Sequence, residues 1–107
     1  MGEHGLVLIT CGDSSEARAI ARRLVESRLA AGAQILPIES VYRWEGEVVE
    51  DQEWLLIVKT RTDRFDSITV VVDGMHTYQV PPVLMIVIDD ASRPYLDWID
   101  DNVTGTT

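Results

Sequence analysis

Three side chains of this sequence could bind a metal ion through nitrogen or sulfur. His76 follows a candidate helix, and its neutral imidazole is a ligand that copper, nickel and zinc accept. Met75, its neighbour, offers a thioether that suits Cu(I). Cys11 ends a candidate strand just before a helix, where the pKa of a thiol can be lowered.

Each of these residues also has a structural interpretation. A histidine at a helix end can hydrogen-bond a backbone carbonyl, so His76 need not be a ligand. Met75 can fill a gap in the core, and Cys11 can act as a small buried apolar residue. The residue types alone favour the structural interpretation and leave both open.

A fourth candidate ligand, His4, lies near the N-terminus. Removal of Met1 would leave a chain that starts Gly2-Glu3-His4, in which one amine, two amides and an imidazole can surround Cu(II) or Ni(II) in a plane. The alternative is a mobile tail without a function.

Motifs for catalysis do not stand out in the sequence. Neither histidine lies in a recognisable nucleophile motif, and no glycine-rich phosphate loop is present. Acidic pairs such as Asp89-Asp90 lack the spacing of a calcium loop and read as solvated surface. We therefore expect a protein that is not an enzyme.

The elements that position these residues begin with an apolar strand at residues 6–10. Asp13 is a candidate helix N-cap, and Glu16, three residues on, completes a capping-box pattern. The helix that follows repeats its apolar residues at intervals of three and four, so that they share one face. Gly32 is predicted to end it as a left-handed cap.

A long antiparallel hairpin is predicted next, with strands near residues 33–44 and 53–60. Pro37 marks the first of these strands as an edge strand or a bulge. Tyr42 and Trp44 are two apart before a Glu-Gly turn and share one face of their strand. A domain this small cannot cover such a hairpin, so Tyr42, Trp44 and Trp54 are expected to pack against a partner chain.

The segment from residue 60 to 75 carries two conflicting patterns. Phe65, Ile68, Val72 and Met75 have helical spacing, whereas residues 68–72 are rich in β-branched side chains that prefer strands. A helix is favoured because the next strand, at residues 83–88, needs a crossover. A short helix with Pro94 in its first turn follows. The order is that of an α+β, ferredoxin-like βαββαβ sandwich with a C-terminal helix.

Composition limits the class of protein and its partners. With 107 residues the chain is one domain, residues 1–107, and its ordered core is expected at about residues 6–101. A formal net charge of -9 argues against nucleic acid, and no stretch is apolar enough to span a membrane. The single cysteine excludes an internal disulfide, and no signal peptide is visible, so a cytoplasmic location is expected.

Several fragments together resemble a known family. They include SVYRWEG at residues 40–46, VLITC at 7–11, and RLAA at 28–31. HTYQVP at 76–81 and PYLDWI at 94–99 continue the pattern. In order and spacing these fragments are similar to the CutA divalent-cation tolerance family over nearly the whole chain. The resemblance implies a homotrimer of ferredoxin-like subunits linked to tolerance of copper and other divalent metals.

The resemblance also bears on the metal ligands. Some bacterial members associate copper with two adjacent histidines and a cysteine on the first strand. Here Met75 stands at the first histidine position, His76 at the second, and Ile9 at the cysteine position. Gly32 replaces a further cysteine common in the family. With these ligands missing, tight Cu(II) binding is predicted in the N-terminal tail at His4, and only weak binding in the folded body.

By the same resemblance, a cleft between subunits is expected. Lys59, Tyr78, Tyr95 and Trp98 would line it together with His76. We therefore expect a non-enzymatic homotrimer that weakly binds copper or another divalent cation. One alternative is a regulatory trimer of the PII type that senses a small metabolite at this cleft. The other is a structural trimer that anchors another protein.

Overall fold

The computed structural model describes residues 2–104. Within that range the chain forms four strands, three α-helices and one 3-10 turn. In order they are β1 (His4–Cys11), α1 (Ser14–Glu26), β2 (Gly32–Trp44), β3 (Glu47–Arg61), the turn Thr62–Arg64, α2 (Phe65–Met75), β4 (Val83–Val87) and α3 (Arg93–Asn102). None of the described helices is long and apolar enough to cross a membrane.

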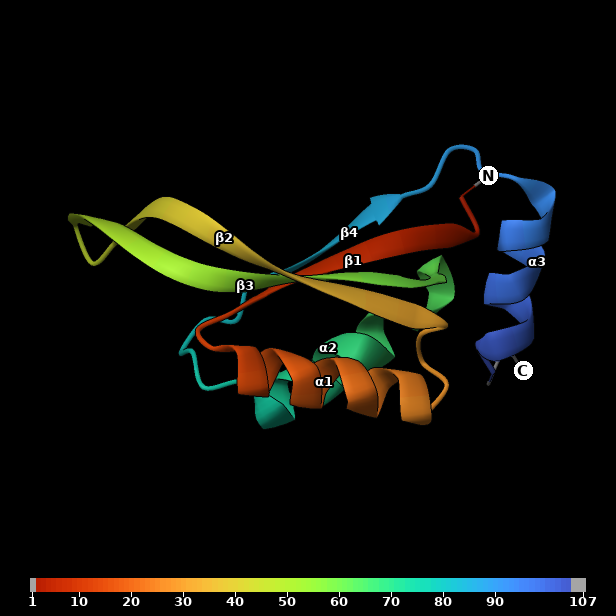
Figure 1. The fold of residues 1–107 in the computed structure, drawn as a ribbon, viewed down its shortest axis with the longest axis horizontal. Coiled ribbons are helices and arrows are strands. Elements are labelled where there is room, and N and C mark those ends of the chain that lie inside the picture. The colour runs from red at the N-terminus through yellow and green to blue at the C-terminus, as the bar shows by residue number, and fades with distance from the viewer. Residues whose placement is uncertain (1, 105–107) are drawn as a thin grey trace.

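The strands form one antiparallel sheet in the order β2-β3-β1-β4. Helices α1 and α2 cover one face of the sheet, and α3 stands at the end away from the hairpin tip (Figure 1). This order and the βαββαβ succession confirm the ferredoxin-like sandwich with an added C-terminal helix. Pro37 lies in β2, an edge strand, as its missing N–H requires.

The core lies between the sheet and the two helices. Alternate side chains of β1 and β3 point to the same side because strand residues alternate between faces. The buried members of this core are Val7, Ile9, Cys11, Ala17, Ile20, Ala21, Leu24, Ala30, Leu56, Val58, Ile68 and Val72. Burial of this surface is the main source of stability for the elements that carry the ligands.

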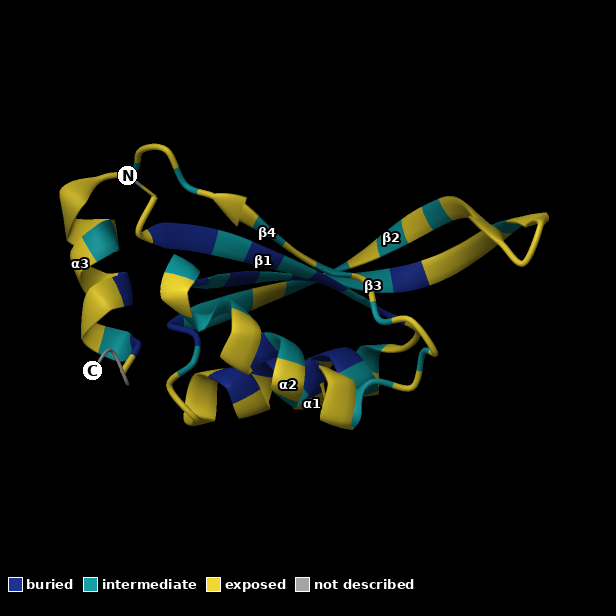
Figure 2. Ribbon diagram, turned by 180° about the vertical axis from the view of Figure 1, so that it is seen from behind, coloured by how far each residue is buried: buried dark blue, intermediate teal, exposed yellow. Residues whose placement is uncertain are grey.

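The opposite face of the sheet is apolar but largely uncovered. On β4, Leu84 is 50% exposed and Ile86 is 47% exposed. They are opposite Leu8 and Leu6 of β1 in the sheet register. Near α3, Ala31, Ile99 and Val103 form a second, small cluster of buried residues. Figure 2 shows that β4 and the outer half of the hairpin are mostly exposed.

The long hairpin is confirmed. Pairing between β2 and β3 runs without a break from Gly32 with Lys59 to Trp44 with Glu47. The two turn residues, Glu45 at φ 50° and Gly46 at φ 84°, are both left-handed, the combination that a two-residue hairpin turn needs. The tip projects beyond the helices (Figure 1).

The start of α1 agrees with the sequence prediction, but its end does not. Asp13 caps the helix by accepting a hydrogen bond from the Glu16 N–H at 2.8 Å. The predicted glycine cap at Gly32 is wrong, because α1 ends at Glu26 and the left-handed residue is Arg28, at φ 60°. Gly32 instead opens β2 beneath α3, where a Cβ atom would lie 3.0 Å from the Trp98 ring.

Residues 65–75 are helical, in spite of their β-branched side chains. Ile68 and Val72 are fully buried in the core shared with α1. The crossover from β3 to β4 therefore outweighs the local preference for a strand.

Candidate functional site

Three potential metal ligands converge where β1 ends, α1 begins and α2 ends. Cys11 is the last residue of β1, Glu16 lies in the first turn of α1, and His76 caps α2. One ligand atom from each lies within 4.8 Å of those from the other two. We call these three residues the ligand cluster. Of the four metal ligands considered from the sequence, Cys11 and His76 belong to it.

The imidazole of His76 is fixed at both nitrogens. Nε2 donates to the Thr10 carbonyl at 2.6 Å, the structural role considered from the sequence. Nδ1 accepts the Tyr78 N–H at 3.0 Å, which identifies Nδ1 as the nitrogen with the lone pair. Histidine ligands of metals commonly donate their other ring N–H to a backbone carbonyl, so the ring is already oriented as a ligand requires.

Glu16 brings negative charge to the same nitrogen. Its Oε2 lies 3.1 Å from His76 Nδ1, and both side chains are almost fully buried. When Nδ1 accepts the Tyr78 N–H, this distance joins two acceptors. Each acceptor has a backbone donor, the Tyr78 N–H for Nδ1 and the Thr77 N–H for Oε2. A cation between the two acceptors would be attracted by both.

The sequence pattern missed Glu16 as a ligand because the capping box predicts that its side chain turns back to Asp13. Instead, its carboxylate accepts from the Thr77 Oγ1 at 2.8 Å and the Thr77 N–H at 3.3 Å. Glu16 thus connects α1 to the loop after α2. No pattern in the neighbouring sequence signals this contact, because Cys11 ends a strand and Glu16 lies in the helix that follows.

Cys11 is fully buried and unpaired. Burial, followed by the negative charges of Glu16, Asp13 and Glu53, raises the pKa of its thiol to about 12. The sequence raised the opposite possibility, a lowered thiol pKa at a helix start. Burial and the carboxylates together outweigh the helix N-terminus here, so the thiol keeps its proton unless a cation displaces it.

The donor set of the ligand cluster fits a borderline divalent cation. Thiolate, imidazole and carboxylate are the ligands of zinc, and the first two also suit copper. Bond lengths of about 2.0–2.3 Å place the ligand atoms of a tetrahedral zinc site roughly 3.3–3.8 Å apart. The 4.8 Å limit on the cluster means that a shift of about 1 Å is enough to close around such an ion.

The other two predicted ligands lie elsewhere. Met75 packs against the hydrophobic core, the structural alternative considered for it. His4 is not in a mobile tail: it opens β1, is 9% exposed, and its Nε2 pairs with Asp100 at 2.9 Å. Thr62 also holds the backbone carbonyls of Gly2 and Glu3. A planar copper site would need residues 2–4 to wrap around the ion, whereas the structure shows them held by Thr62 and Asp100.

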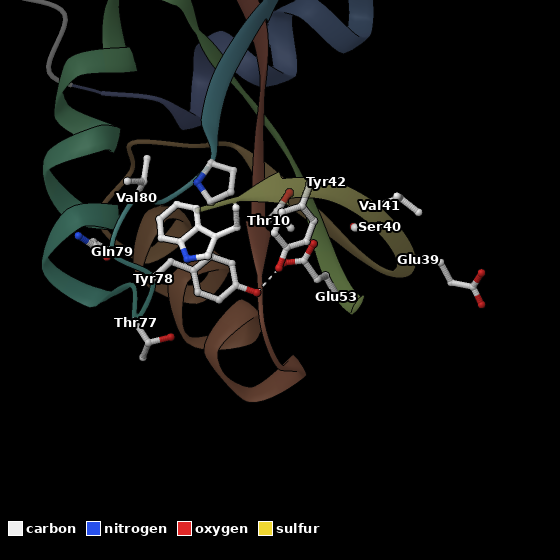
Figure 3. A pocket seen from close by; sticks show the side chains of 12 residues that line it. Thr10, Glu39, Ser40, Val41, Tyr42, Glu53, Thr77, Tyr78, Gln79 and Val80 are labelled. Carbon is white, nitrogen blue, oxygen red and sulfur yellow. Dashed lines mark hydrogen bonds between the residues drawn. The ribbon is translucent and has the colours of Figure 1, made fainter. Parts of the chain in front are cut away.

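A cleft lies near the ligand cluster, along the outer half of the hairpin (Figure 3). It has a volume of about 840 Å³, and its walls come from the loop after α2 and from the hairpin strands. Tyr78 donates to Glu53 at 2.5 Å across its floor. Burial and this hydrogen bond raise the pKa of Tyr78 above its usual range. We call this cavity the hairpin cleft.

The residues expected to line one cleft fall in two groups within a subunit. Tyr78 lies in the hairpin cleft beside His76. Lys59 donates to Gln34 near the opposite end of the sheet, and burial lowers its pKa. Trp98 lies there as well, against Gly32, and stacks on Tyr95 with 5.4 Å between ring centroids. Their meeting between subunits stays a prediction.

The three expected interface residues also differ from one another. Tyr42 is 37% exposed and Trp44 41% exposed, on the outer half of the hairpin. Tyr42 donates to Asp51 at 2.6 Å, and this hydrogen bond raises its pKa to about 12. Trp54, in contrast, packs against the core of its own subunit. Its side chain is partly buried within the single subunit.

The sheet order, the two covering helices and the elongated hairpin define the chain as a ferredoxin-like protein of the long-hairpin kind. Residues 5–102 match the family model described as CutA1 divalent ion tolerance protein. The chain therefore belongs to this family.

Relatives from distant organisms agree in sequence and structure. The divalent-cation tolerance protein CutA of Thermus thermophilus is 49% identical over 98 residues, which are 91% of this chain and 95% of the relative. Among solved structures, CutA of Archaeoglobus fulgidus has a TM-score of 0.92 at 40% identity, with coverage of 94% and 99%. CutA1 of Oryza sativa has a TM-score of 0.93 at 35% identity, with coverage of 98% and 97%.

Proposed function

We propose that this protein binds a borderline divalent cation of the copper and zinc class at the ligand cluster, and that it does so without catalysing a reaction. The observation that carries the proposal is the convergence of Cys11, Glu16 and His76 within 4.8 Å. Family membership supports it, because the family is described by divalent ion tolerance. The softness of sulfur and nitrogen donors favours copper or zinc over magnesium or calcium.

Each ligand has a defined contribution. His76 would use Nδ1, since its Nε2 is engaged with Thr10. Glu16 would supply a carboxylate that already faces this nitrogen. Cys11 would lose its proton on binding, so the affinity for the cation falls as the pH is lowered. A bound cation also removes the repulsion between the two facing acceptors.

The nearness of Cys11 and His76 invites comparison with cysteine enzymes. A catalytic cysteine needs a thiolate at neutral pH, produced by neighbouring positive charge. Here burial and three carboxylates raise the thiol pKa to about 12, which is the wrong direction for a nucleophile. The electrostatics therefore support a cation-binding role and not a catalytic one.

The proposal includes assembly as a homotrimer in the cytoplasm. Exposed apolar side chains on the open sheet face and aromatic residues on the hairpin give a surface that a second and third copy could cover. A free buried cysteine is compatible with a reducing compartment. We expect sedimentation to give the mass of three chains.

Cobalt titration tests the cation site directly. Co(II) added to the reduced, metal-free protein should give a thiolate-to-cobalt charge-transfer band in the near ultraviolet. Cys11→Ser should abolish the band, and His76→Ala or Glu16→Gln should lower the affinity for Co(II) by about 10-fold or more. The control is His4→Gln, which should leave the titration unchanged. A band that survives Cys11→Ser, or depends on His4, would refute the site.

A further inference from the structure

The ligand atoms of the cluster are engaged by one short segment, residues 77–80, which directly follows His76. Thr77 donates to the Glu16 carboxylate through Oγ1 and through its N–H. Tyr78 donates its N–H to His76 Nδ1. A cation at His76 Nδ1 needs the one lone pair that accepts the Tyr78 N–H, and at the Glu16 carboxylate it competes with the two Thr77 donors. Binding must therefore displace the Tyr78 donor and weaken the hold of Glu16 on Thr77.

The same segment forms a wall of the hairpin cleft. Thr77, Tyr78, Gln79 and Val80 all line the cavity, and Tyr42, Trp44 and Glu53 line it from the hairpin side. In Figure 3 the Tyr78 hydroxyl reaches across to Glu53. Residues 77–80 are thus shared between the ligand cluster and the cleft.

The Tyr78 ring is confined on several sides. It packs against the His76 ring with 4.8 Å between the centroids. It also lies against the backbone of Gly12, where an added Cβ would meet the Tyr78 hydroxyl oxygen at 3.1 Å. Glu53, which accepts a hydrogen bond from the Tyr78 hydroxyl, is only 5% exposed. A shift of the Tyr78 backbone therefore cannot leave its ring and the Glu53 hydrogen bond unchanged.

We propose that cation binding at Cys11, Glu16 and His76 is coupled to the hairpin cleft through residues 77–80. The cation displaces the Thr77 and Tyr78 donors, the segment moves, and the Tyr78 hydroxyl leaves Glu53. This inference rests on the proposed function and specifies how the same site is regulated. This coupling is reciprocal. If the cation weakens the Tyr78–Glu53 contact by a given factor, that contact weakens cation binding by the same factor.

Tyr78→Phe is the sharpest test of the coupling. It keeps the ring and removes only the hydroxyl that anchors the segment to Glu53. The anchored, cation-free form loses a hydrogen bond to a charged group, and Co(II) should then bind about 10-fold more tightly. The control is Thr69→Val, which removes a hydroxyl that donates to the Asp66 carbonyl within α2 and should leave the Co(II) affinity unchanged. Thr77→Val, which removes a donor to Glu16, should also tighten binding.

Hydrogen exchange gives a second, independent measurement. Co(II) should accelerate exchange at the Thr77 and Tyr78 amides of the wild-type protein, since both lose their acceptors. If the Cys11-dependent band appears but these rates and the Tyr78→Phe affinity do not change, the coupling is refuted while the proposed function stands. If no band appears in any variant, both proposals fall. Far-ultraviolet circular dichroism of each variant establishes that it is folded. If Tyr78→Phe does not fold, Thr77→Val replaces it as the test of Co(II) affinity.

Discussion

The replacement Trp44→Ala tests the proposed assembly most directly. Trp44 lies near the hairpin tip and is 41% exposed in the isolated subunit. With about 250 Å² for a whole tryptophan side chain, about 100 Å² remains for a partner to cover. At about 25 cal/mol per Å² this surface contributes about 2.5 kcal/mol for each subunit, or about 7.5 kcal/mol for a trimer.

This energy translates into a large change in the concentration at which the trimer dissociates. About 7.5 kcal/mol corresponds to roughly 5.5 decades in the association constant of three chains. The midpoint concentration of a trimer varies with the square root of that constant, so it should rise several-hundred-fold. Fluorescence-detected sedimentation velocity over a dilution series measures the midpoint, with added guanidinium chloride if the wild-type trimer persists throughout.

The control for this experiment is Val70→Ala. Val70 is 72% exposed on α2, on the helix side of the subunit, and should not affect assembly. A wild-type protein that sediments as a stable monomer would refute the trimer. A trimer whose midpoint is unchanged by Trp44→Ala would place the interface elsewhere than the outer hairpin.

Three further predictions concern the stability of the subunit. Trp54→Ala should lower the free energy of unfolding by ~3 kcal/mol, because its ring packs on the core, and chemical denaturation should show this with little change in assembly. Ile99→Ala should lower the free energy of unfolding by ~3 kcal/mol and accelerate amide exchange in α3, since Ile99 is the fully buried residue of that helix. The pKa of Asp100 is lowered, since hydrogen bonds from His4 and Arg61 outweigh its partial burial. Its stabilisation is therefore present above about pH 4 and lost as the pH falls through the lowered pKa, and Asp100→Asn should flatten acid denaturation there.

The sequence was most informative where one physical requirement acted alone. Alternating aromatic residues and a Glu-Gly turn predicted the hairpin. A two-residue hairpin turn needs left-handed residues, and Gly46 adopts that conformation at φ 84°. The edge position of Pro37 followed from its missing N–H. The helix at residues 65–75 needed a topological argument, since its β-branched residues locally favour a strand.

Prediction failed where a tertiary contact replaced the local rule. The left-handed position after α1 falls on Arg28, which lacks the conformational freedom of glycine, while Gly32 serves the close approach of Trp98. Glu16 satisfies a capping-box pattern, yet its carboxylate reaches Thr77. Neither long-range contact has a signature in the neighbouring sequence.

The candidate site shows the same division. His76 and Cys11 were recognisable as candidate ligands from their residue types. That they meet Glu16 depends on how β1, α1 and α2 pack, which spacing along the chain does not specify. The position of His4 near a terminus suggested a free tail, whereas the structure places it at the start of β1. Its pairing with Asp100 joins residues from opposite ends of the chain.

The register of the hairpin has a consequence for the order of folding. Pairing of β2 with β3 begins at a two-residue turn and closes no loop, so each further pair costs little chain entropy. Pairing of β1 with β4 instead joins the two ends of the chain, for instance Gly5 with Val87. We expect the hairpin to form early and to act as the template on which β1 assembles, with β4 last. Substitutions near Gly46 should then slow folding, whereas those in β4 should mainly accelerate unfolding.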